Sequence, residues 1–124
     1  MASLMENLID VLDRESTEYE ALLQLSQRKT PIIAGGDLAE LQKITDEEQL
    51  VSRIHNLDKQ RAGVTADIAD VLNRDVNDLK LPNLITMLSA RPAEQQALAD
   101  SHDRLQAAVR GLKRVNEQNS ELLN

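Results

Sequence analysis

Aliphatic residues recur along the chain with helical spacing. In the first part they return every three or four positions from Met5 to Leu22, and Glu15 occupies one position of this seam. That spacing is typical of one face of an amphipathic α-helix. We expect a first helix over about residues 3–34, in which Pro31 removes one backbone hydrogen bond and produces a kink or a frayed last turn.

A glycine pair separates the first helix from the second. Gly35 and Gly36 suit a helix C-terminus, and Asp37 is followed three residues later by Glu40, as in a capping box. The second helix is therefore predicted over about residues 38–72. Its inward-facing positions are Leu41, Ile44, Val51, Ile54, Leu57, Val64, Ile68 and Val71.

The stretch NRDVNDLKLP interrupts the helical pattern, because Asn and Asp favour turns and the residue before Pro82 favours an extended backbone. A short helix is predicted after it, over about residues 83–89. Pro92 suits the first turn of a last helix over about residues 93–123. The seam of that helix consists of Leu98, Ser101, Leu105, Ala108, Leu112, Val115, Asn119 and Leu122.

These elements predict an all-α fold in a single domain over residues 1–124. A short loop between the first two long helices requires them to run antiparallel, and the third must cover the remaining apolar faces. We expect an elongated antiparallel helical bundle of three long helices with a short connecting helix. The composition agrees, since 41% of the residues are hydrophobic but only 1% are aromatic.

The balance of charges excludes several classes of function. With 21 acidic and 14 basic residues, the formal charge of −7 repels phosphate backbones, so we expect no nucleic-acid partner. The absence of cysteine excludes disulfides and thiolate metal sites. No apolar run approaches the roughly 20 residues that span a bilayer, and the acidic start lacks the basic region of a signal peptide. We therefore expect a cytoplasmic protein without membrane insertion.

The two histidines are the natural candidates for chemistry. His55 has only Asp58 one turn away, and a single such pair does not form a metal site. Histidine phosphotransfer domains place Lys and then Gly after an exposed histidine, whereas His102 is followed at those places by Leu105 and Gln106. A phosphotransfer module stays an alternative that these residues disfavour. We expect no catalysis, no cofactor and no metal.

The last helix instead offers a surface for another helix. Ala108 and Gly111 lie beside Leu112 in a patch where a second backbone can come close, either from the first two helices or from a partner. Toward the C-terminus the seam continues through two asparagines, which are poor core residues, to Leu122 and Leu123. That continuation favours a partner.

The segment GGDLAELQKITDEEQLVSRIHNLDKQR resembles the FlgN family of flagellar export chaperones. The residues at the family's positions are Leu38, Leu41, Ile44, Thr45, Glu47, Glu48 and Arg61. LKLPNLITML is similar to the family's short middle segment. VNEQNSELL is similar to its Asn-x-x-Asn-x-x-Leu stretch, here at Asn116, Asn119 and Leu122.

The resemblance implies a cytosolic chaperone without ATPase activity. Such a chaperone binds the helical C-terminal region of hook-associated proteins, which form the hook-filament junction, keeps them from assembling early and delivers them to the type III export gate. The family's client-binding helix lies at the C-terminal end and usually continues beyond the point where this sequence stops, so we expect the seam to be its root or remnant. The predicted partner-binding residues are Ala108, Gly111, Leu112, Val115, Asn116, Asn119, Leu122 and Leu123. The alternative is a structural coiled-coil adaptor that self-associates, as a homo-oligomer, through the same seam.

Overall fold

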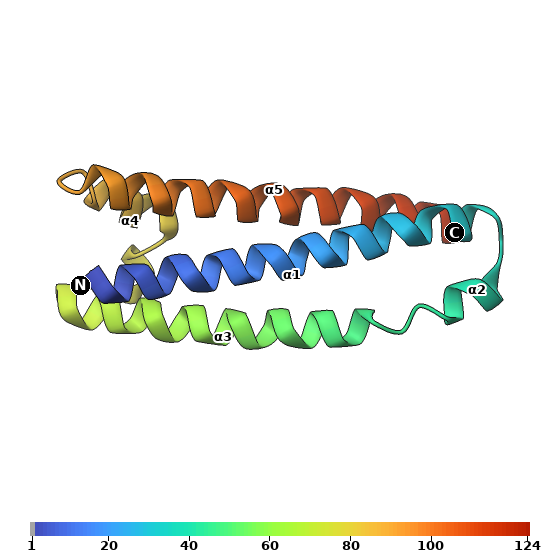
Figure 1. The fold of residues 1–124 in the computed structure, drawn as a ribbon, viewed down its shortest axis with the longest axis horizontal. Helices are drawn as coiled ribbons and strands as arrows, with labels where there is room; N and C mark the ends of the chain where they lie inside the picture. The colour runs from blue at the N-terminus through green and yellow to red at the C-terminus, as the bar shows by residue number, and fades with distance from the viewer. Residues whose placement is uncertain (1) are drawn as a thin grey trace.

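Three long helices lie side by side in a computed structural model that describes residues 2–124 (Figure 1). They are α1 (Ala2–Ala34), α3 (Glu47–Leu72) and α5 (Pro92–Leu123). α1 lies in the middle and packs along both neighbours, whereas α3 and α5 make no extended contact with each other. Because Figure 1 looks down the shortest axis, the three helices form a single layer. The prediction of an all-α fold is confirmed, and the described residues contain no strand.

The two interfaces of α1 differ in direction. α1 and α3 run antiparallel, so that Glu18 pairs with Arg53 and Lys29 with Glu47. α1 and α5 run parallel, because η1 (Val76–Asp78) and α4 (Leu81–Met87) carry the chain across to the side of α5 before that helix begins. The expected antiparallel pairing of the first two long helices is thus found in α1 and α3, and α5 packs along α1 in the parallel direction.

The helix expected over residues 38–72 is broken in two. A single short helix, α2 (Leu38–Gln42), comes first, and the side chain of Asp37 caps it by accepting the amide N–H of Glu40 at 3.0 Å. α2 contains no buried residue, so no packing holds it in line with α3. The β-branched pair Ile44–Thr45 in the intervening segment lowers helix propensity further. The chain can therefore bend here before α3 begins at Glu47.

Of the three prolines, Pro31 lies inside α1, whereas Pro82 and Pro92 lie at the starts of α4 and α5. α1 continues through Pro31 to Ala34, and the amide of Gly35 donates to the carbonyl of Pro31 at 3.0 Å, so the last turn is not frayed. The short helix begins at Leu81, two residues earlier than the expected range of 83–89, because Pro82 fits in a first turn whose amides have no helical partner. The last helix likewise starts with its proline, Pro92.

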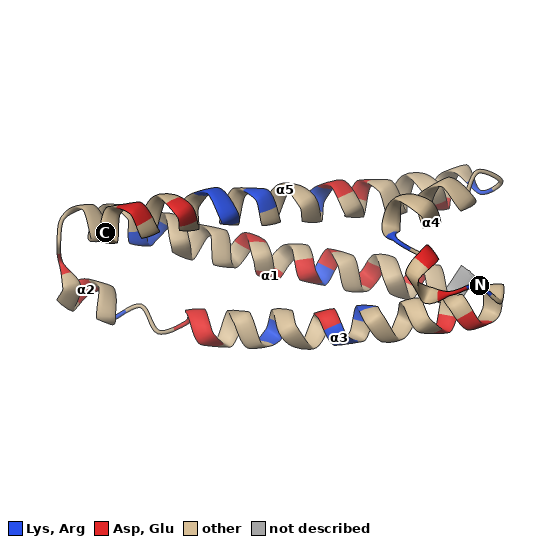
Figure 2. Cartoon of the chain, turned by 180° about the vertical axis from the view of Figure 1, so that it is seen from behind, with Lys and Arg blue, Asp and Glu red and all other residues tan. Residues whose placement is uncertain are grey.

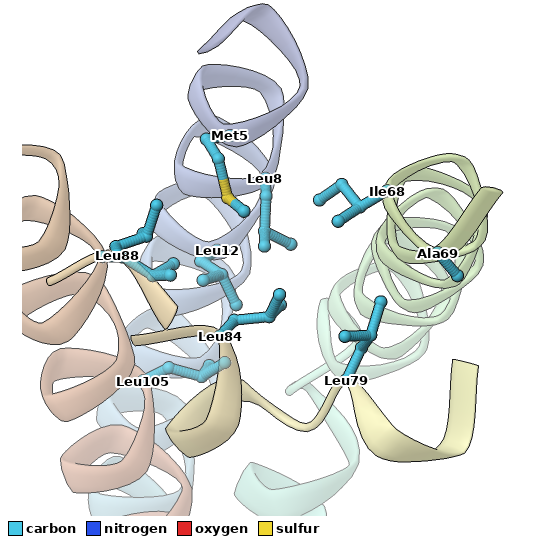
Figure 3. Packing of buried hydrophobic residues seen from close by; sticks show 10 residues of the cluster. Met5, Leu8, Leu12, Ile68, Ala69, Leu79, Leu84, Leu88 and Leu105 are labelled. Carbon is cyan, nitrogen blue, oxygen red and sulfur yellow. The ribbon is translucent and has the colours of Figure 1, made fainter. Parts of the chain in front are cut away.

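The main hydrophobic core lies where α4 covers the end of the layer (Figure 3). Its ten buried members come from all three long helices, from α4 and from the residues that directly follow η1 and α4: Met5, Leu8, Leu12, Ile68, Ala69, Leu79, Leu84, Leu88, Leu98 and Leu105. A smaller cluster of Leu22, Leu25, Leu50, Ile54 and Leu112 lies further along. Each fully buried leucine stabilises the fold by about 1.5–3 kcal/mol. After Leu112, α5 contains no buried apolar residue.

One carboxyl group is buried in the seam of α1. Glu15 is 0% exposed, and its Oε1 lies 3.3 Å from Nε of Arg61 on α3. Nη2 of Arg61 also lies 3.4 Å from Oδ1 of Asp58. Burial is the main cause that raises the pKa of Glu15 to about 8; the nearby carboxyl group of Asp58 adds to it, and Arg61 opposes it. Glu15 therefore keeps its proton at neutral pH.

Glu15→Gln should stabilise the protein at pH 8 by about 1–3 kcal/mol, because it replaces a buried group that must either bind a proton or be charged. Between the ordinary value of 4.5 and about 8, the folded state binds a proton that the unfolded state has released, so stability falls as pH rises. Thermal melts from pH 5 to pH 8 should show this slope in the wild type and a flatter one in the variant. The exposed Glu6→Gln on the same helix is the control. A less stable Glu15→Gln at pH 8 would mean that the charged pair with Arg61 holds the two helices.

Candidate functional site

The eight predicted partner-binding residues lie on different faces of the C-terminal half of α5. Four are buried against the rest of the chain: Ala108, Gly111, Leu112 and Asn119. Val115 is half-buried, and the exposed residues are Asn116, Leu122 and Leu123. The structure therefore leaves a smaller surface for a partner than the sequence suggested.

The small-residue patch is occupied by α1. A Cβ atom added at Gly111 would lie 3.1 Å from Cδ2 of Leu23, so the glycine lets the two helices approach closely. Ala108 is 4% exposed, and Leu112 packs in the cluster that contains Leu22. These residues position α5 on α1 and are not free to contact a partner in this conformation.

Asn119 also faces α1, although the sequence suggested that it is a poor core residue. Its Oδ1 accepts the hydroxyl of Thr30 at 2.6 Å, and its Nδ2 donates to the carbonyl of Ser26 at 2.9 Å. The hydroxyl of Ser26 donates to Oδ1 of Asn116 at 3.0 Å. We call Ser26, Thr30, Asn116 and Asn119 the polar clasp. Because α1 supplies partners for the amide, the asparagine can be buried.

Sequence reasoning missed Ser26 and Thr30. Their signal was weak: two hydroxyl residues four positions apart in the apolar pattern of α1, matching two asparagines three positions apart in α5. Paired polar residues inside a helical seam fix register and partner, as a buried asparagine does in coiled coils. The clasp thus favours the parallel register of α1 and α5.

The polar clasp holds the last turns of α5 less firmly than a hydrophobic core would. A hydrogen bond between protein groups contributes about 0.5–1.5 kcal/mol net, less than the burial of a leucine. The start of α5, by contrast, is packed in the main core through Leu98 and Leu105. The C-terminal end of α5 is therefore the part of the layer that separates most easily.

Apolar side chains remain uncovered on this half of α5. Leu122 is 45% exposed, Leu123 is 59% exposed and Val109 is 39% exposed. A shallow hollow runs along the same helix, lined by Val109, Leu112, Lys113, Asn116, Glu117 and Ser120. Val109 and Leu123 lie on nearly the same side of the helix, and exposed apolar residues beside a shallow hollow suit contact with another helix.

Ion pairs lie along the rim between α1 and α5. Nη2 of Arg104 lies 2.6 Å from Oε1 of Glu20, and its Nη1 is 4.0 Å from Oδ1 of Asp13. The hydrogen bond from Arg104 is the main cause that lowers the pKa of Glu20. The hydroxyl of Ser101 donates to Oδ1 of Asp13 at 2.8 Å. The rim reinforces the parallel pairing but provides no enclosed chemical site.

The histidines do not assemble a reactive group. His55 is exposed on α3, and Nδ1 of His102 lies 3.6 Å from Oδ1 of the adjacent Asp103. In residues 2–124, no group of three or more histidine or acidic side chains could hold a metal ion. None of the helices described is both long and apolar enough to cross a membrane.

Comparison with known proteins gives one match. The family model described as FlgN protein matches residues 1–124. This range contains α5 and every residue of the polar clasp. No curated protein and no solved structure matches the chain.

Asn119→Ala should lower the free energy of unfolding by about 1–2 kcal/mol, because it removes the two hydrogen bonds that join Asn119 to α1. The loss should be local: amides of residues 115–123 should exchange with solvent faster, while those of residues 98–105 stay protected. Native-state hydrogen exchange measures both. Gln118→Ala, at an exposed neighbouring position, is the control and should change neither. Uniformly faster exchange along α5 would contradict a local role for the polar clasp.

Proposed function

Because the chain belongs to the FlgN family, a family of flagellar chaperones, we propose that it is a cytoplasmic chaperone for hook-associated proteins. In this proposal it binds the helical C-terminal region of such a client, prevents its premature assembly and aids its delivery to the type III export gate. The match over the whole chain is the observation that carries the proposal. It acts by binding alone, without an enzymatic step.

The exposed end of α5 is the proposed binding surface. Val115 and Leu122 are seven residues apart and so share one helical face, and Leu123 lies beside them. Covering a leucine completely contributes about 1.5–3 kcal/mol. A client helix that covers Leu122 and Leu123 would therefore gain affinity at the same time as its own apolar face is hidden.

The buried members of the predicted site have an indirect role in this proposal. Ala108, Gly111, Leu112 and Asn119 fix the position of α5 on α1 and so determine how the exposed residues are presented. The direct contacts would come from Val115, Asn116, Leu122 and Leu123. Helix-in-groove recognition of this kind needs one amphipathic helix from the client.

The same exposed leucines could also join two copies of the chain. In that case the protein would be a self-associating coiled-coil adaptor, and its apparent mass would depend on concentration. The two functions differ in their response to a client, because a chaperone should release any second copy when a client helix binds. Light scattering with and without the client separates them.

Leu122→Asp combined with Leu123→Asp should weaken binding of a hook-associated protein's C-terminal segment at least ten-fold, which is about 1.4 kcal/mol. The physical reason is that carboxylates exposed at a helix end stay hydrated, but covering them with a client removes that hydration. Thermal stability should be nearly unchanged. Calorimetric titration and thermal melts measure the two effects.

Two controls separate the surface from the fold. Gln118→Asp with Asn124→Asp adds the same charge at exposed positions in the same turns and should bind normally. Leu105→Asp, in the main core, should unfold at a much lower temperature. The proposed site is wrong if the leucine double variant binds normally or melts as early as the Leu105 variant.

A further inference from the structure

The middle of α5 is basic, although the chain as a whole is acidic. The chain has a formal charge of −7, yet the stretch from Arg104 to Asn116 contains four basic residues and no acidic one. Figure 2 shows blue bands on this part of α5, with acidic bands on either side of them. Arg104 pairs with Glu20 across the rim. The other three bases, Arg110, Lys113 and Arg114, form what we call the cationic strip.

An acidic residue, Glu117, follows the cationic strip one turn later on α5, but no ion pair joins it to the strip. All three residues are exposed, and none of them forms an ion pair with another part of residues 2–124. At about 3.6 residues per turn, Arg110 falls nearly opposite the buried side of the helix, where Ala108 and Leu112 lie. The strip thus points away from α1 into solvent.

The cationic strip lies beside an apolar surface. Lys113 lines the same hollow as Val109, which is 39% exposed, and the hollow also contains the carboxylate-bearing Glu117. One side of α5 therefore combines an exposed aliphatic residue with a group of residues in which cations outnumber acids. The complementary shape and charge belong to an amphipathic helix that carries carboxylates along one edge of its apolar face.

We propose that the cationic strip binds the carboxylate-bearing edge of the client's docking helix, while Val109 and Leu123, which lie on nearly the same side of α5, contact its apolar face. This inference rests on the proposed chaperone function and adds the chemistry that selects the client. The bases supply orientation and selectivity, because exposed ion pairs favour one register of the helix over another. Nucleic acid is a poorer partner, since acidic residues flank the strip and dominate the rest of the chain.

Two synthetic helical peptides test the proposal. Both carry the same leucine face; one has glutamates along one edge and the other has glutamines at the same places. The wild-type protein should bind the glutamate peptide about ten-fold more tightly, as expected for three exposed ion pairs. This preference should disappear at about 1 M salt, where the Debye length is about 3 Å.

The variant R110Q/K113Q/R114Q should bind both peptides equally, and the client segment about ten-fold more weakly than wild type. The matched control is R28Q/K59Q/R74Q, which removes the same charge at exposed positions that form no ion pair within residues 2–124. The control should keep the preference for the glutamate peptide. Melting temperatures of both variants should match the wild type, because only exposed side chains change.

The outcomes separate this inference from the proposed function. If the client segment binds wild type and R110Q/K113Q/R114Q equally, the chaperone function stands and the cationic strip is not part of its site. An equal loss in both triple variants would show that only net charge matters, which also overturns the inference. A DNA duplex that competes with the glutamate peptide would identify the strip as a general anion surface instead. If wild type prefers the glutamate peptide but binds no hook-associated protein, the proposed function fails while the selectivity for acidic helices remains.

Discussion

The double burial of α1 is the constraint on which the architecture depends. α3 and α5 make no extended contact with each other, so each is held mainly through its own face of α1. A helix with two buried faces has fewer positions in contact with water, so some of its polar residues must lie at the interfaces with its neighbours. This accounts for Glu15, Ser16 and Ser26 inside the seam, each with a polar partner on α1 or on the neighbouring helix. The result is a single layer of helices.

The two ends of this layer are held by different forces. At one end α4 and Leu79, the residue after η1, complete a hydrophobic core to which all three long helices contribute buried leucines, isoleucines or methionines. At the other end the polar clasp joins α1 to α5 with hydrogen bonds that contribute little net free energy. The hydrophobic core therefore keeps one end of the layer folded, whereas separating α1 from α5 at the polar clasp costs less free energy. The proposed client surface lies at the clasped end, where displacing the chain's own contacts costs least.

Ionisable groups behave differently in the interior and on the surface of the protein. In the interior, one carboxyl group keeps its proton because burial outweighs the arginine beside it. On the surface, acidic residues dominate except along the cationic strip of α5. An acidic protein with a group of exposed bases beside the exposed Val109 has a surface suited to an acidic amphipathic helix. The three bases of the cationic strip contribute little to the stability of the fold, since none of them is buried.

The sequence alone determined that the chain is helical and where most helices end, because leucine spacing, Gly35–Gly36 and the prolines act on the nearest few residues. It also carried the family resemblance that the match over residues 1–124 confirmed. It did not determine the break before α3, since only the absence of buried residues in α2 shows that nothing holds the helix straight. It also could not place Asn119, whose partners Ser26 and Thr30 are about ninety residues away along the chain. Helical periodicity predicts which face of a helix is buried, although Val51 and Val71, both expected to face inward, are exposed. Only the tertiary structure shows which helix covers a face and so which residues of the seam are buried and whether a polar residue can lie there.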